Sequence, residues 1–281
     1  MAKKHRRSEE PRQVVVVSDI HAGCRMGLCP AEGVRLDDGG LYAPSTIQKK
    51  MYGLWREFWD DWVPQVTQGE PYDVVFNGDA VDGCHHNSTH QWSHNMKDQQ
   101  ECAFALLEPV ARGAVRYYHI RGTEAHVGQS GVHEEQLAQR LGAVPNAEGQ
   151  YARWELWHRV SGHLVHFLHH VGSTGSAAYE ATAVHKELTE SFVEAGRWGR
   201  EAPQVVVRSH RHRYIKDEIA GAKGYYVSVV SPAWQAKTPF TWKIPGARLS
   251  QPQFGGLLIR KGDEELHTRA KVWSLERSQE G

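Results

Sequence analysis

Carboxylate and imidazole side chains recur in short, regularly spaced groups along this chain of 281 residues, which contains 18 histidines. Together they offer the oxygen and nitrogen ligands that transition metals accept in proteins. In an extended segment residues i and i+2 point to the same side, so Asp-x-His and His-x-His spacings let two side chains reach one ion. The sequence therefore predicts metal ligands in five groups, which are Asp19–His21, Asp79–Asp82, Thr123–His126, His169–His170 and His210–His212.

Each group comes directly after an apolar run that predicts a buried strand. β-Branched residues dominate several of these runs, as is typical of strands covered on both faces. In an open α/β sheet the loops beyond the carboxyl ends of the strands converge on one crevice, so we expect the five groups to meet there. The runs are Gln13–Ser18, Asp73–Phe76, Val115–Ile120, His163–Leu168 and Gln204–Arg208.

The ligand types restrict the metal. The four cysteines lack zinc-ribbon spacing, so the set consists of oxygen and imidazole nitrogen without thiolate. Such a set favours Mn, Fe, Zn, Ni or Co over Ca or Mg. Seven candidate ligand side chains are too many for one tetrahedral zinc and suit two ions that share a bridging carboxylate. Such a pair of ions is typical of in-line displacement at phosphorus.

The elements that must position these groups predict an α/β fold. Strands and helices alternate early in the chain, and hairpin-like strand pairs dominate later, which favours one α/β domain over residues 13–275 with a layered α-β-β-α sandwich of mixed sheets. An aromatic stripe at helical spacing within residues 44–64 is assigned to the core. Further helices are expected at residues 95–110, 131–141 and 177–195.

Composition limits the class of partner. The 33 Lys and Arg residues balance 33 Asp and Glu residues, so a nucleic acid would have to meet a local basic patch. No run approaches the roughly 18 apolar residues of a membrane span, and no membrane partner is expected. Few cysteines and no signal segment predict a cytoplasmic protein. Residues 1–12 are expected to form a disordered basic tail.

The five groups, in this order, resemble the motifs of the calcineurin-like metallophosphoesterase superfamily: D-x-H, G-D-x-x-D, G-N-H-E/D, a middle H and G-H-x-H. The resemblance extends from Val14 to about Arg213, and the stretches R-G-T-E-A-H-V-G and S-H-R-H-R-Y look most similar to phage- and prophage-type members. It implies metal-dependent hydrolysis of a phosphodiester or phosphomonoester by a hydroxide that two metal ions activate.

The resemblance also implies a role for individual residues. Asp82 would orient a metal ligand or the catalytic imidazole. His170 is the alternative to His169, because the sequence does not say which of the two faces inward, and it is otherwise a candidate for substrate binding. The implied metal ligands are Asp19, His21 and His212 for one ion, His169 and His210 for the other, and Asp79 as the bridge between them.

The third group departs from the family pattern. Where the family has Gly-Asn-His, this chain has Gly122-Thr123-Glu124-Ala125-His126, so the Asn ligand is missing. Either Thr123 or Glu124 would take its place on the second metal. His126, displaced by two positions, is the best candidate for the general acid, and Arg121 is a candidate for substrate binding.

Two loops are expected to shape the substrate site. Residues 83–97 carry His85 and His86, which either contact phosphate or a base or belong to a solvated excursion. Residues 231–253 interleave aromatic and basic side chains, as in a stacking platform for single-stranded nucleic acid, although packing on the domain itself or on a second subunit would give the same pattern. The members of the second loop are Trp234, Lys237, Phe240, Trp242, Lys243 and Arg248.

The sequence is therefore compatible with three functions. The first is a phosphoesterase acting on nucleic acid, with single-stranded or duplex-end DNA or RNA as its partner. The second is a small-molecule or cyclic-nucleotide phosphatase or phosphodiesterase. The third, of another class, is a catalytically inactive, metal-bound binding scaffold.

Overall fold

The computed structural model describes residues 11–85, 87–128, 130–172, 177–222, 224–243 and 250–275. Most of the expected tail (residues 1–10), the candidate His86 and Arg248 of the second loop lie outside these ranges, so the predictions made for them stay untested.

A six-stranded sheet is built around β1 (Gln13–Val17), whose five residues are all buried. β1 pairs in parallel with β4 (Asp73–Asn77) and antiparallel with β12 (Gln253–Lys261). β5 (Tyr117–Ile120) continues the parallel part toward β6 (Ala152–Arg153), and β13 (Leu266–Ser274) closes the other edge. The carboxyl ends of β1, β4 and β5 therefore lie at one edge of this sheet.

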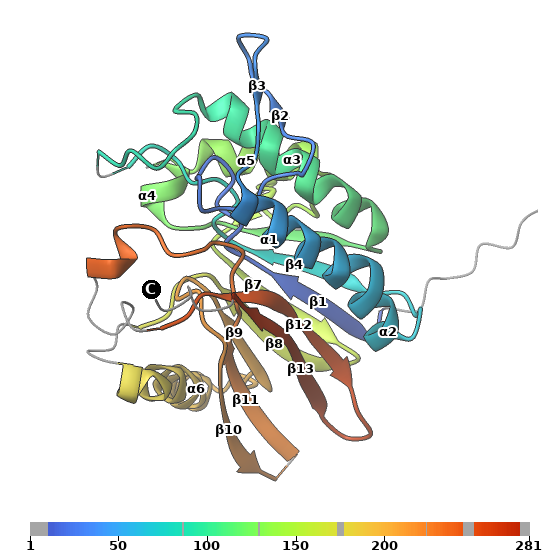
Figure 1. The fold of residues 1–281 in the computed structure, drawn as a ribbon. Coiled ribbons are helices and arrows are strands. Elements are labelled where there is room, and N and C mark those ends of the chain that lie inside the picture. Colours follow the sequence, from blue (N-terminus) through green and yellow to red (C-terminus); the bar gives the residue numbers. More distant parts are fainter. Residues whose placement is uncertain are drawn as a thin grey trace, which may run out of the picture.

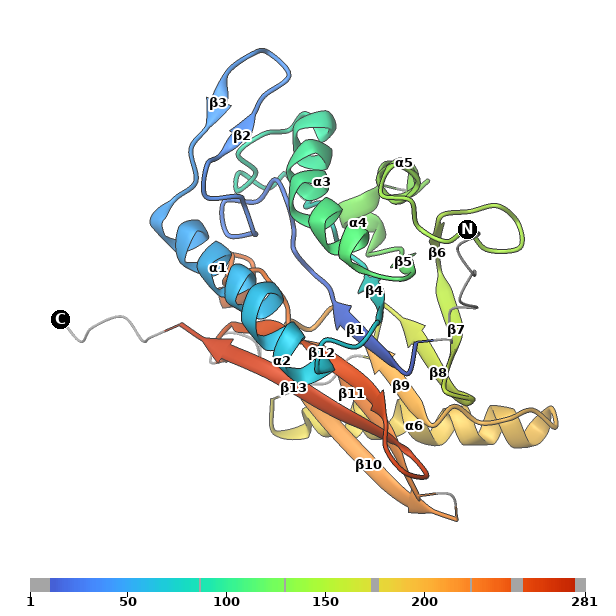
Figure 2. The same ribbon diagram turned by 90° about the vertical axis from the view of Figure 1, so that its right-hand side faces the viewer.

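A second, five-stranded sheet has the order β10-β11-β9-β8-β7. β7 (Glu155–Val160) and β8 (His163–Leu168) form a hairpin through the two-residue turn Ser161-Gly162, and both turn residues have positive φ. β9 (Val205–Arg208) runs parallel to β8 on one side and to β11 (Gly224–Val230) on the other, and β10 (Ile215–Gly221) forms the edge. A short separate hairpin, β2 (Val34–Arg35) and β3 (Leu41–Tyr42), projects from the body in both views (Figures 1 and 2).

Helices cover the outer faces of the two sheets (Figure 1). One side carries α1 (Thr46–Glu57), a π-helical turn η1 (Phe58–Trp62), α2 (Val63–Thr67), α3 (Met96–Gly113), α4 (Glu124–Val127) and α5 (Val132–Arg140). The other side carries a 3-10 turn η2 (Ala177–Tyr179) followed by α6 (Glu180–Arg197). A last 3-10 turn, η3 (Thr241–Lys243), lies in the late loop.

Alternate residues of β1 face two different cores. Val14 and Val16 belong to the cluster between the sheets, whereas Val15 and Val17 belong to the cluster between the first sheet and its helices. The predicted α-β-β-α sandwich with mixed sheets is therefore confirmed. Among the described residues, no helix combines the length and apolar character that crossing a membrane requires.

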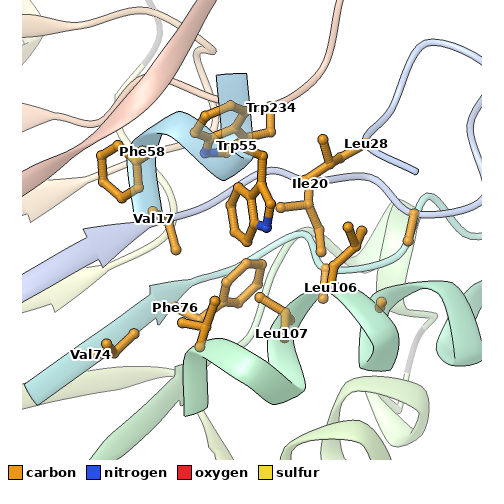
Figure 3. Packing of buried hydrophobic residues seen from close by; sticks show 14 of the residues in the cluster. Val17, Ile20, Leu28, Trp55, Phe58, Val74, Phe76, Leu106, Leu107 and Trp234 are labelled. Carbon is orange, nitrogen blue, oxygen red and sulfur yellow. The ribbon is translucent and has the colours of Figure 1, made fainter. Parts of the chain in front are cut away.

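The aromatic stripe of α1 and η1 packs in the helix-side core, as predicted (Figure 3). Trp234 of the late loop packs there as well and is 0% exposed, with its ring 5.0 Å from Trp55 and 6.0 Å from Phe58. Of the two alternatives left open for this loop, Trp234 therefore follows packing on the domain itself and not a stacking platform, because burying its large apolar ring among aromatic neighbours is favourable. One long helix was expected over residues 44–64, but the structure ends α1 at Glu57 and continues through a π-turn.

Candidate metal centre

The loops after β1, β4, β5, β8 and β9 meet on the side of the molecule where α4 lies (Figure 1). Backbone hydrogen bonds tie these loops together: the Asp19 N–H donates to the Gly78 carbonyl over 2.9 Å, and the Ser209 N–H donates to the His169 carbonyl, also over 2.9 Å. These backbone hydrogen bonds lie directly after the strands, so the arrangement of the strands also positions the side chains of the loops.

Two groups of three side chains are close enough to hold one ion each, with ligand atoms that all lie within 4.8 Å of one another. A third group, His21, Asp82 and His126, shares His21 with the first. The first two groups match the two sets that the resemblance implies, and they are Asp19, His21 and His212, and Asp79, His169 and His210.

Asp79 lies between the two groups. Its Oδ2 is 3.0 Å from Nε2 of His169 and 3.8 Å from Nε2 of His21. Its Oδ1 accepts a hydrogen bond from the Thr123 N–H over 2.7 Å, so Oδ2 is the atom that faces both sets of imidazoles. This is the position that a bridging carboxylate needs.

Asp19 provides a direct test of whether these residues fit a cation. Its Oδ1 is buried and has no hydrogen-bond partner among the described residues. Nε2 of His212 is 3.2 Å away without hydrogen-bond geometry, and Nε2 atoms of His21 and His169 are each 3.9 Å away. Burying a carboxylate oxygen without a hydrogen bond or a positive charge beside it costs on the order of several kcal/mol, as for any unpaired buried charge. The residues therefore fit a bound cation.

The backbone of these loops is strained. In the described part of the chain eight non-glycine residues have positive φ, and five of them are candidate ligands: Asp19, His21, Asp79, His210 and His212. Each such conformation costs on the order of 1–3 kcal/mol and persists only where the surroundings enforce it, which is most common at functional sites. The concentration of strain here indicates a site built to hold these side chains in one arrangement.

The pKa values of Asp19 and His169 also indicate a site that favours positive charge. Burial would raise the pKa of Asp19, but His169 and His212 outweigh burial and hold that pKa at about 2. Burial would lower the pKa of His169, but Asp79 and Asp19 raise it to about 10. The two carboxylates thus favour positive charge at this position, whether it is a proton on His169 or a metal ion.

Thr123, rather than Glu124, lies where the family Asn is missing. Its Oγ1 is 3.3 Å from Asp79 Oδ2, 3.4 Å from His169 Nε2 and 3.1 Å from His210 Nδ1. Glu124 is exposed and belongs to none of the ligand groups among the described residues. Similarly, His169 is buried with its Nδ1 2.7 Å from the Asn77 carbonyl, whereas His170 is exposed beside it.

Asp82 binds the candidate ligand His21 on the side away from the other ligands. Its carboxylate accepts from Nδ1 of His21 over 3.2 Å, from Nε2 of Gln91 over 2.6 Å and from Nε2 of Gln235 over 3.3 Å. Burial raises its pKa, but hydrogen bonds from His21 and His85 outweigh this and lower it far below the usual range for an aspartate. Holding Nδ1 of His21 as the donor leaves Nε2 with its lone pair toward Asp19 and Asp79.

His126 stands at the edge of the centre. Its Nδ1 is 2.7 Å from the Asp82 carbonyl, which can only accept, so Nδ1 carries the hydrogen. Its Nε2 is 3.9 Å from Asp79 Oδ2 and faces the ligands. The rings of His21 and His85 pack edge-on against it at centroid distances of 4.5 and 4.6 Å.

A pocket of about 380 Å³ opens beside His126 and His85. The remaining lining residues come from the loop after β4 and from α3, α4 and α5, and they are Cys84, Met96, Glu124, Ala125, Gly128 and His133. His85 therefore lines a pocket, and its contact with phosphate or a base stays a prediction.

Arg121 is turned to another part of the fold. Its Nε donates to the Ala152 carbonyl over 2.7 Å, its guanidinium is 3.4 Å from Glu135, and it packs over the Trp154 ring. None of these partners belongs to the ligand groups, so the structure does not bring Arg121 to the centre.

Two further side chains at the site belong to none of the motifs found in the sequence. Gln91 and Gln235 both bind Asp82, and Gln235 comes from the late loop, 153 residues away along the chain. The Trp234 N–H donates to the Asp19 carbonyl over 3.0 Å, so this loop is fixed to the centre by its backbone too. No local spacing signals such long-range contacts.

No protein-family model and no curated protein matches this chain. Among solved structures it is similar to Vps29 of Entamoeba histolytica in complex with Zn²⁺, at 11% identity and a TM-score of 0.42, over 93% of this chain and 98% of that one. It is also similar to vacuolar protein sorting 29 of Cryptosporidium parvum, at 10% identity and a TM-score of 0.41, over 94% and 98% of the two chains.

A third similar structure is a predicted phosphoesterase of Streptococcus pneumoniae, at 10% identity and a TM-score of 0.35, over 94% of this chain and 97% of that one. Likeness at this level carries no argument about function. The function has to be argued from the residues of this chain.

Proposed function

We propose that this chain is a metal-dependent phosphoesterase of the calcineurin-like type that holds two divalent ions and hydrolyses a phosphodiester. The observation that carries the proposal is the position of Asp79 Oδ2, which lies 3.0 Å from Nε2 of His169 in its own ligand group and 3.8 Å from Nε2 of His21 in the other. The order of the five sequence motifs supports the same function independently.

The residues divide between the two ions. Their oxygen and nitrogen ligands suit Mn, Fe, Zn or Ni. Two such ions, when bound, neutralise charge on phosphate oxygens and make water a nucleophile near neutral pH. Asp79 would bridge the ions, with Asp19, His21 and His212 on one and Thr123, His169 and His210 on the other.

His126 would act as the general acid. Its Nδ1–H is held by the Asp82 carbonyl, so the second nitrogen, Nε2, is the one that can carry a proton toward the centre. In the imidazolium form Nε2 donates that proton to the departing alkoxide oxygen and His126 becomes neutral, a step worth about 10²–10⁴-fold in rate.

The pocket beside His126 would hold the leaving group. A general acid must lie next to the oxygen it protonates, and the pocket of about 380 Å³ starts at His126. This volume suits an organic leaving group that contains several rings. It therefore favours an ester of a large alcohol as the substrate.

Single-stranded nucleic acid is the first candidate among such esters. Beyond Gln235 the late loop exposes Phe240 and Trp242, which are 63% and 60% accessible, and Lys237 lies over the Trp242 ring at 4.2 Å. Exposed aromatic rings beside a cation are what base stacking and backbone attraction need.

The test is hydrolysis of bis-p-nitrophenyl phosphate and of p-nitrophenyl phosphate in Mn²⁺, followed by hydrolysis of single-stranded DNA. We expect diester activity that Asp79→Asn abolishes. If only the monoester p-nitrophenyl phosphate reacts, the proposed substrate class is wrong. If two ions bind but no phosphate ester reacts, the chain is a metal-bound scaffold and the proposal fails.

A further inference from the structure

Glu134, on α5, is a buried carboxylate that the motifs do not include. Its side chain is 0% exposed, although an isolated buried carboxylate is costly. One oxygen, Oε1, accepts from the Ala80 N–H over 2.9 Å, and the other, Oε2, accepts from the Gly122 N–H over 2.7 Å. Both hydrogen bonds are therefore made to backbone.

The two donors belong to the two loops that carry the bridging and the replacement ligand. Ala80 directly follows Asp79, and Gly122 directly precedes Thr123. The loops touch here: a Cβ atom added to Gly122 would lie 2.0 Å from Oδ1 of Asp79. Any change in their separation would therefore move Asp79 Oδ2 relative to Thr123 Oγ1.

The conformation of Asp79 explains why a clamp is needed. Asp79 has a φ of 57°, which is unfavourable for a residue with a side chain. The hydrogen bond from the next amide, that of Ala80, to Glu134 fixes the peptide that follows Asp79 and so restrains this strained residue from its C-terminal side.

We propose that Glu134 is a positioning residue that sets the metal affinity of the centre by clamping the loops after β4 and β5. The proposal rests on the metal centre proposed above. His119 stands behind the clamp, with Nε2 3.8 Å from Glu134 Oε1 and Nδ1 3.1 Å from the Tyr117 hydroxyl, so the carboxylate faces a polar neighbour on that side as well.

The next residue of the same helix is a matched control. Glu135 also accepts two backbone hydrogen bonds, each 2.8 Å long, from Tyr151 and Ala152. Those amides lead into β6, which carries no member of the ligand groups. Glu134→Gln and Glu135→Gln therefore make the same chemical change in the same helical turn. Only Glu134 accepts from the backbone amides next to Asp79 and Thr123. Glu135 meets the loop after β5 only through the Arg121 side chain, 3.4 Å away, which points away from the ligand groups.

The experiment is titration of the metal-free full chain with Mn²⁺ and with Zn²⁺ by calorimetry, with thermal unfolding measured in parallel. In Glu134→Gln the carboxamide presents an N–H₂ donor to one of the two amides, so one clamp is lost. We expect metal affinity to fall 10–100-fold, the range for groups that orient metal ligands. Glu135→Gln should stay within about twofold of wild type, well below that range.

Each outcome decides one question. If wild type binds neither ion, the proposed metal centre itself fails. If wild type binds and Glu134→Gln binds equally well while melting lower, Glu134 is only structural and the inference is overturned. Equal loss in both variants also overturns it. Should Glu134→Gln not fold, Glu134→Asp keeps the charge but shortens the reach, and unchanged affinity in that variant would overturn the inference.

Discussion

Replacing Asp82 by Asn tests how the residues behind the ligands tune the centre. The new carboxamide can keep its oxygen toward Nδ1 of His21 and Nε2 of Gln235, which both donate to Oδ1 of the carboxylate. Its N–H₂ would then face Gln91, whose Oε1 is buried and has no partner among the described residues, so a flip of Gln91 restores a hydrogen bond. The variant should therefore fold and lose chiefly the negative charge.

The magnitude follows from that change. A hydrogen bond to a charged group contributes about 1.5–3 kcal/mol and one between neutral groups about 0.5–1.5 kcal/mol, so about 1–1.5 kcal/mol is lost at His21. This corresponds to roughly tenfold weaker binding at the ion held by Asp19, His21 and His212. Asp82→Ala removes the orienting group altogether and should weaken binding by about 10–100-fold.

The assay is metal titration of the metal-free chain, with Asp98→Asn as the control. Asp98 is also a buried carboxylate, and it accepts from the Ser93 hydroxyl over 2.5 Å and from the Asp37 N–H over 2.8 Å, without contact to the ligand groups. If Asp82→Ala binds metal as wild type does, or if Asp98→Asn weakens binding as much, the role assigned to Asp82 is wrong.

Three further changes test separate parts of the structure. His126→Gln should lower the turnover of bis-p-nitrophenyl phosphate by about 10²–10⁴-fold with metal content unchanged, and loss of metal would contradict its role as acid. Thr123→Val keeps the shape but removes the hydroxyl, so calorimetry should show weaker binding of one ion only, and two unchanged affinities would show that Thr123 is no ligand. Burial raises the pKa of Asp73, but His158 and Arg116 outweigh it and lower that pKa. This stabilisation is present above the unfolded pKa of about 4 and is lost as pH falls. Asp73→Asn should therefore cost about 1–3 kcal/mol at pH 7 and flatten the acid side of urea-unfolding stability, and an unchanged acid slope would count against it.

The sequence predicted the strands best, because buried β-branched runs such as Gln13–Val17 are both a local signal and a tertiary requirement. It also predicted that the side chains after these strands would meet, since parallel strands deliver their ends to one edge of a sheet. Which side chain faces inward was not predictable. The choice between His169 and His170 depends on how β8 pairs with β9, where the His169 carbonyl accepts from the Ser209 N–H.

Contacts that join distant segments escaped prediction for the same physical reason. Interleaved aromatic and basic residues in the late loop fitted either a stacking platform or packing on the domain itself, and tertiary packing divides them, with Trp234 buried in the core and Trp242 exposed. Glu134, Gln91 and Gln235 are ordinary polar residues in the sequence, and only the folded chain shows that each binds a loop or a carboxylate of the centre.

The proposed function depends on two metal ions bound on either side of Asp79. The most direct measurement is anomalous scattering from crystals of the chain loaded with Mn²⁺ or Zn²⁺. We expect two peaks about 3.5–4 Å apart, the usual separation in two-metal sites. One peak should lie among Asp19, His21 and His212 and the other among Asp79, His169 and His210. A single peak, or ions bound away from Asp79, would contradict the proposed function.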